Sequence, residues 1–171
     1  MLRIMGAILI MAGCSGIGFW YRKRFYLGLG HLLSMRQILE LFMSEIGYGK
    51  AALPECCKRV GERVEEPYRD ALLKIHAGME RKESGFRDCW HKEMEKSLKQ
   101  LPVSEREKEI FLSFPDCCGL QDNRMQIRAI EQYRDMLNTA ILRREAELEK
   151  QGKLAAGLGI MCGLLLAIML Y

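Results

Sequence analysis

Cysteine and histidine are the residue types in this sequence whose side chains could carry out chemistry. The 171-residue chain contains seven cysteines and three histidines. Cys56-Cys57 and Cys117-Cys118 are adjacent pairs, whereas zinc ligands are usually about two to four residues apart, and neighbours on a helix point in different directions. No ligand-spaced pair occurs among His31, His76 and His91. We therefore predict no metal and no cofactor, and small reduced thiols that fill space in a core.

A cysteine nucleophile is the alternative reading of the same residues. The attacking thiol would be Cys89 or one of the cysteine pairs, with His76 or His91 as the base. Nothing near these residues indicates a pocket or an orienting group. The sequence also has no Walker-type phosphate loop and no dinucleotide-binding glycine pattern. We predict that the protein is not an enzyme, with a small membrane enzyme using a Cys/His site as the alternative.

The net charge of +4 raises the possibility of nucleic-acid binding, but the positions of the charges argue against it. The basic excess lies beside the apolar ends of the chain, at Arg3, Arg22, Lys23, Arg24 and Lys153. The middle carries basic and acidic residues in nearly equal number, whereas a nucleic-acid footprint requires clustered basic residues on the folded domain. Mixed charges such as those at 143–150 are typical of solvated helix faces, and Arg143 and Arg144 could also contact anionic lipid headgroups.

Both ends of the chain are apolar and uncharged, at 4–21 and 154–171. Each run would form a helix about 27 Å long, close to the thickness of a bilayer hydrocarbon core. We predict two transmembrane helices. A secretory signal peptide fits the first run poorly, because the strongest basic cluster follows the apolar run instead of preceding it.

The basic residues that flank these runs set the predicted orientation. Arg22, Lys23 and Arg24 follow the first run, and Lys150 and Lys153 precede the second. Both clusters belong on the cytoplasmic side of a membrane, where they would contact lipid headgroups. The predicted organisation is an N-terminal transmembrane helix with its flank (1–26), a cytoplasmic helical bundle (27–150) and a C-terminal transmembrane helix (151–171).

The middle of the chain shows helical periodicity and no sustained strand alternation. The fold class is therefore all-α: an antiparallel bundle of about six helices flanked by a transmembrane helix at each end. The first bundle helix is expected at about 29–48 and the last runs from Asp122 into the second span. The remaining helices are expected to start at Pro54, after Pro67, at the N-cap Ser84 and at the Ser104–Glu107 capping box.

Two connections between helices, 45–54 and 114–126, combine glycine, proline, aromatic and polar residues. On a purely structural reading, each is an ordinary corner between two helices. As function they would present polar groups to a partner at the ends of the bundle. The residues proposed for partner binding are Glu45, Tyr48, Gly49, Pro54, Gly119, Asp122 and Gln126.

On these residues the chain resembles the stage III sporulation protein AB family of endospore-forming Firmicutes. The resemblance covers the whole chain and is most specific at Glu45-Ile46-x-Tyr48-Gly49 with the Leu53-Pro54 turn, and at Phe114, Gly119, Asp122 and Gln126. The order Leu53-Pro54 departs from the family's Pro-Leu turn. Pro115 and Cys118 stand where the family commonly has Gly and Leu.

The resemblance implies a role that composition and spacing do not. The family is similar to the inner-membrane platform proteins of type II secretion and type IV pilus machines, within a channel between mother cell and forespore. Implied partners are a secretion-type ATPase like stage III sporulation protein AA, other membrane subunits of the channel, and membrane lipids, with no nucleic acid. The helical domain would face the mother-cell cytoplasm. A purely structural membrane spacer is a further alternative.

Overall fold

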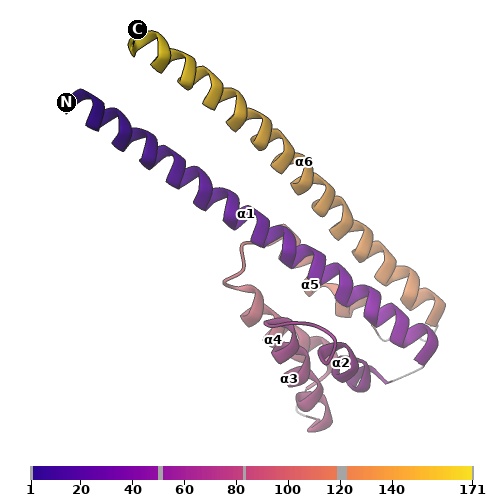
Figure 1. The fold of residues 1–171 in the computed structure, drawn as a ribbon. Helices are drawn as coiled ribbons and strands as arrows, with labels where there is room; N and C mark the ends of the chain where they lie inside the picture. Colours follow the sequence, from indigo (N-terminus) through magenta and orange to yellow (C-terminus); the bar gives the residue numbers. More distant parts are fainter. Residues whose placement is uncertain (1, 50–51, 83, 119–122, 171) are drawn as a thin grey trace.

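The computed structural model describes the backbone of residues 2–49, 52–82, 84–118 and 123–170, and the side chains of 23–48, 52–82, 84–118 and 124–150. Over this part of the chain it contains α-helices and one short 3-10 helix but no strand. Two long helices, α1 (Leu2–Gly49) and α6 (Asn123–Leu170), run antiparallel and project together beyond the bundle (Figure 1). The short elements pack beside them: α2 (Leu53–Gly61), α3 (Tyr68–Glu80), α4 (Phe86–Leu98), α5 (Glu105–Leu112) and η1 (Phe114–Cys117).

The helical bundle is confirmed, but the predicted break between the N-terminal helix and the first bundle helix is wrong. The first bundle helix does not start near residue 29, because α1 is continuous from Leu2 to Gly49. No proline interrupts that stretch, so the helical hydrogen bonding can continue along it. The predicted continuous last helix is confirmed in α6.

The search for a membrane span gives a negative result over the described residues. Within them, no helix has the length and apolar character needed to cross a membrane. The side chains of the two predicted spans, 4–21 and 154–171, lie outside that part of the structure.

The predicted helix starts are largely confirmed. Pro54 lies in the first turn of α2, and α3 starts directly after Pro67. At α5 the Ser104 hydroxyl accepts a hydrogen bond from the Glu107 backbone N–H at 3.4 Å, and the Ser104 N–H donates to the Glu107 carboxylate at 2.8 Å. This is the predicted capping box. Ser84 is not an N-cap, because Gly85 takes that position and the Ser84 hydroxyl lies 3.3 Å from the Cys89 thiol.

Trp90 lies at the centre of the bundle core, where α1, α4, α5 and η1 meet. Its ring centroid is 5.9 Å from that of Phe42, 5.6 Å from Phe86, 5.3 Å from Phe111 and 5.0 Å from Phe114. The Trp90 indole N–H donates to the Phe111 carbonyl at 3.3 Å, which satisfies its one polar group in the core. This aromatic cluster attaches the short helices to the antiparallel pair formed by α1 and α6, which we call the α1–α6 hairpin although the short helices separate them in the sequence.

The α1–α6 hairpin has a regular seam of buried apolar side chains. On α1 these recur at alternating spacings of four and three residues, as in a coiled coil, at Leu32, Met35, Leu39, Phe42 and Ile46. Arg36 Nη1 donates to Asn138 Oδ1 at 3.2 Å, and a Cβ built on Gly47 would lie 3.3 Å from Ile127. The same number of residues separates Arg36 from Gly47 and Ile127 from Asn138, so the helices keep one register between these pairs.

Candidate functional site

The two predicted corners come together at the end of the hairpin that lies away from the chain termini (Figure 1). The contact between Gly47 and Ile127 sets the end of α1 beside the start of α6. Tyr48 is 92% exposed there and Met125 is 62% exposed. We call this end of the molecule the distal tip. Gly49 is the last residue of α1. Gly119 and Asp122 lie outside the described residues.

Glu45 is buried at this tip, with 7% of its surface exposed. Its carboxylate oxygens lie 3.3 Å from Arg59 Nη1 on α2 and 3.2 Å from Arg63 Nη1, which follows the end of α2 by two residues. Arg59 also bonds Glu55, and its hydrogen bonds to Glu55 and Glu45 raise its pKa. Glu45 thus fixes α2 against α1, and the two exposed arginines form the outer surface of this corner.

Pro54 and Gln126 also make contacts within the protein. The Pro54 carbonyl accepts a hydrogen bond from His76 Nδ1 at 3.0 Å, which joins α2 to α3. Gln126 is buried beside Cys118. The hydrogen bond that the Cys118 thiol donates to Cys117, together with burial, raises the pKa of Cys118, whereas the hydrogen bond from Gln126 lowers it. Among the described candidates, Tyr48 is therefore the side chain that the tip presents to solvent.

The described cysteines are reduced thiols, and Cys56, Cys57, Cys89 and Cys117 are buried. Burial raises the pKa of Cys56 to about 11 and raises the pKa of Cys57 as well. At neutral pH both are held as thiols, which are poor nucleophiles. Across the side chains that the structure describes, no group of three His, Cys, Asp or Glu residues is placed to hold a metal ion.

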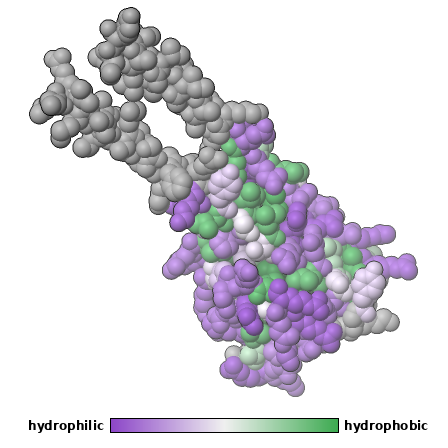
Figure 2. All heavy atoms as spheres, in the orientation of Figure 1, coloured by the Kyte–Doolittle hydropathy of each residue, from purple (hydrophilic) through white to green (hydrophobic). Residues whose placement is uncertain are grey.

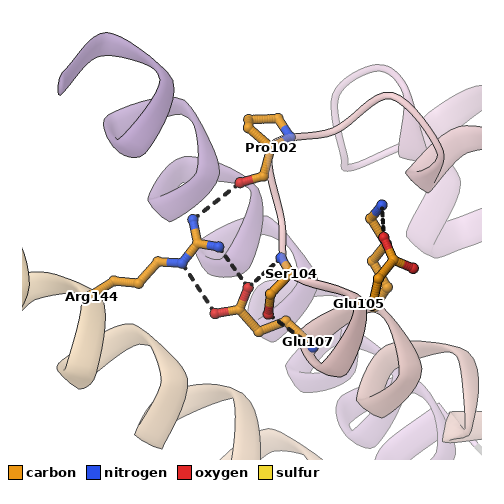
Figure 3. Close-up of polar contacts among 6 residues, drawn as sticks. Pro102, Ser104, Glu105, Glu107 and Arg144 are labelled. Carbon is orange, nitrogen blue, oxygen red and sulfur yellow. Dashed lines mark hydrogen bonds and ion pairs between the residues drawn. The ribbon is translucent and has the colours of Figure 1, made fainter. Parts of the chain in front are cut away.

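An ion pair that the sequence reasoning missed lies at the other end of the bundle, where the two long helices leave it (Figure 3). Arg144 of α6 binds Glu107 of α5 through two bonds, Nη2 to Oε2 at 2.7 Å and Nε to Oε1 at 3.1 Å. Arg144 Nη1 also donates to the Pro102 carbonyl at 3.1 Å, and its guanidinium carbon lies 5.3 Å from the centroid of the Phe25 ring. We call this set of contacts the neck clamp.

Gly28 of α1 lies against the neck clamp, and its lack of a side chain leaves the space that Arg144 and Pro102 occupy. A Cβ at this position would lie 2.0 Å from Arg144 Nη1 and 2.3 Å from the Pro102 carbonyl oxygen. The capping box signals the position of Glu107 in the sequence, but no local pattern signals its partner. Arg144, expected to be solvated or at a lipid headgroup, is instead largely buried in the ion pair.

The predicted basic flank is visible in part. Lys23, Arg24 and Lys150 are exposed, whereas the side chains of Arg22 and Lys153 lie outside the described residues. In Figure 2 the described surface is largely hydrophilic with smaller apolar areas, and the terminal helices are not coloured.

Comparisons with known proteins agree with one another. The family model for stage III sporulation protein AB matches residues 3–171. A curated protein of Bacillus subtilis (strain 168), stage III sporulation protein AB, is 22% identical over 170 residues, which is 99% of each chain. A solved structure of a stage III sporulation protein AB superimposes with a TM-score of 0.65 at 16% identity, over 72% of this chain and 97% of the solved one. At that identity the solved structure supports the fold alone.

Proposed function

Because this chain belongs to the stage III sporulation protein AB family, we propose that it is a membrane-anchored platform in the sporulation channel that docks a secretion-type ATPase at the distal tip. Such a protein resembles the platform proteins of type II secretion and type IV pilus machines. It performs no reaction of its own. The single observation that carries the proposal is that both predicted binding corners meet at the end of the hairpin farthest from the two apolar runs.

The register of the hairpin supports anchoring at two points on one membrane. Tyr21 lies as far before Arg36 as Lys153 lies after Asn138, so the register of the Arg36–Asn138 pair sets Tyr21 level with Lys153. The bundle-side ends of the two uncharged runs then lie at the same height on neighbouring antiparallel helices, and both runs extend away from the bundle. Two spans at a common height can occupy one bilayer without burying the basic flanks.

The distal tip suits a protein partner because it combines an exposed aromatic side chain with charged groups. Tyr48 supplies a rigid aromatic anchor, and tyrosine and arginine are the residues enriched at interface hot spots. Arg59 lies on α2 and Arg63 in the turn that follows it, and both pair with the buried Glu45. From Tyr21 to Tyr48 the helix extends about 40 Å, so the tip reaches well beyond the headgroup layer.

Co-purification of the full chain in detergent with the ATPase tests this role. We expect Tyr48→Ala to weaken binding by about 30-fold, the effect of a strong hot spot. Tyr26→Ala is the matched control, since Tyr26 is an exposed tyrosine of the same helix at the opposite end of the bundle. Asp122→Ala tests the second corner.

Folding of each variant can be checked through the fluorescence of Trp90, which is buried in the core. If folded Tyr48→Ala and Asp122→Ala both bind as the parent does, the distal tip is not the docking surface. If the ATPase does not bind the parent chain at all, the platform role itself is wrong.

A further inference from the structure

A basic pocket lies at the neck of the molecule, between α1, the α4–α5 connection, the first turn of α5 and α6. It has a volume of about 660 Å³. Four cationic residues line it, Arg24, Lys99, Lys108 and Arg144, with Glu105 as the acidic one. The apolar part of its wall includes Phe25 and Leu101. We call it the neck pocket, and Figure 1 shows the connection between α4 and α5 on the side of the bundle from which the long helices emerge.

Lys108 is the least solvated cation of the neck pocket, with only 9% of its surface exposed. Its ammonium is 2.8 Å from a carboxylate oxygen of Glu105, a residue whose side chain is 90% exposed. A solvated carboxylate offsets only part of the desolvation cost of a buried ammonium, because a buried charge normally requires a well-ordered counter-charge. An anion entering the pocket would supply one.

Lys99 adds a second positive charge to the neck pocket. It is exposed at the end of α4, and it forms no ion pair with another described residue. Arg144, by contrast, is already held by Glu107. The neck pocket thus has a positive charge to which the two lysines contribute most directly. Phosphate groups are the anions that such lysine clusters bind as point charges.

The position of the neck pocket identifies the source of the phosphate. Arg24 lies three residues after Tyr21, the end of the first apolar run, a rise of about 4.5 Å along α1. Each headgroup layer of a bilayer is about 5–8 Å thick, so Arg24 is at headgroup depth. This step rests on the membrane anchoring proposed above. Phe25 and Leu101 would contact the glycerol portion of a lipid at that depth.

We propose that the neck pocket binds the phosphate group of an anionic lipid, with Lys99 and Lys108 as its main contacts and Arg24 at its rim. A lipid held there joins the α4–α5 connection to the bilayer surface. It thereby fixes the height and tilt of the bundle, and with it the position of the distal tip.

Native mass spectrometry of the full chain in detergent tests the proposal with three probes: phosphatidylglycerol, phosphatidylcholine and inorganic phosphate. We expect phosphatidylglycerol to be retained in preference to phosphatidylcholine. Each lysine near a membrane contributes the equivalent of about a fivefold change in affinity, so Lys99→Gln should lower phosphatidylglycerol affinity about fivefold. Lys92→Gln is the matched control, because Lys92 is an exposed lysine of α4, the helix that Lys99 caps, and does not line the pocket.

Two outcomes would overturn the site. If Lys99→Gln and Lys108→Gln, both folded by Trp90 fluorescence, retain phosphatidylglycerol as the parent does, the lipid binds elsewhere. If inorganic phosphate occupies the pocket while phosphatidylglycerol is not preferred, the ligand is a free phosphate and not a lipid. Extraction of membranes with carbonate tests the anchoring separately, and the lipid measurement does not involve the ATPase, so failure here is distinguishable from failure of the platform role.

Discussion

Replacing Gly28 by alanine should destabilise the bundle, although alanine is the better helix former. The added Cβ would overlap both Arg144 Nη1 and the Pro102 carbonyl oxygen. The Arg144 side chain cannot simply move away, because two bonds to Glu107 and one to Pro102 fix its guanidinium. The carbonyl belongs to the backbone of the α4–α5 connection and moves only with it.

The expected size of this effect follows from two opposing contributions. Breaking a buried ion pair costs about 3–5 kcal/mol, because the remaining charge is left without a partner. The gain from glycine to alanine within a helix is about 1 kcal/mol. The net loss is therefore about 2–4 kcal/mol, which corresponds to a lowering of Tm by about 5–15 °C for a chain of this size.

Gly30→Ala is the matched control. Gly30 lies two residues along the same helix, and a Cβ there would meet nothing within 4 Å. We expect Gly30→Ala to stabilise the protein by about 0.5–1 kcal/mol, since it gains helix propensity without a clash. The two substitutions are chemically identical. Stability changes of opposite sign would therefore be due to the contacts of the neck clamp.

Fluorescence of Trp90 provides the assay. The chain has two tryptophans, Trp20 and Trp90, so a Trp20→Phe background leaves the core indole as the only reporter. Thermal and urea unfolding of the full chain in detergent then follow the bundle. A Gly28→Ala protein as stable as the Gly30→Ala protein would refute the reasoning, because it would mean that Arg144 and the Pro102 carbonyl do not pack against Gly28.

Three further predictions concern the capping box, the ion pair and a buried thiol. Ser104→Ala should lower the free energy of unfolding by about 1 kcal/mol through loss of the N-cap, measured from the urea midpoint. Arg144→Met should lower the free energy of unfolding by about 3–5 kcal/mol. Adding Glu107→Gln should recover part of that loss, since the double variant buries no unpaired charge. Equal stability of the single and double variants would contradict a direct pair. Cys56 has a pKa raised to about 11 from 9.0, so its alkylation at pH 8 should be at least about 100-fold slower than in unfolded protein and should accelerate as pH rises, followed by mass spectrometry of its peptide. By the same shift, its contribution to stability is complete below about pH 9 and is lost as pH rises towards 11.

Local signals account for the parts of the fold that the sequence predicted correctly. The capping box at Ser104 and Glu107, the helix starts at Pro54 and Pro67, and the uninterrupted α6 all depend on residues within one or two turns of each other. The error at the start of α1 has a related cause. Apolar and amphipathic stretches differ in composition but not in backbone preference, so a change in composition near residue 26 does not end a helix.

The candidate site was predictable only as a pair of corners. Glu45 and Tyr48 are three residues apart on one helix, yet the first is buried in ion pairs and the second is almost fully exposed. Which of the two a partner can reach depends on where α2 packs. That packing depends on contacts between residues far apart in the sequence.

By itself, the sequence determined that this protein is helical, where its charged and apolar segments lie, and which family it belongs to, because each of these depends on residue type and short-range spacing. The tertiary structure alone decided that Gly28, Pro102, Glu107 and Arg144 meet at one point and that the two corners share one tip. Those contacts arise where a 48-residue helix returns antiparallel along another. No interaction within a few helical turns encodes that register, so it is set only when the whole core packs.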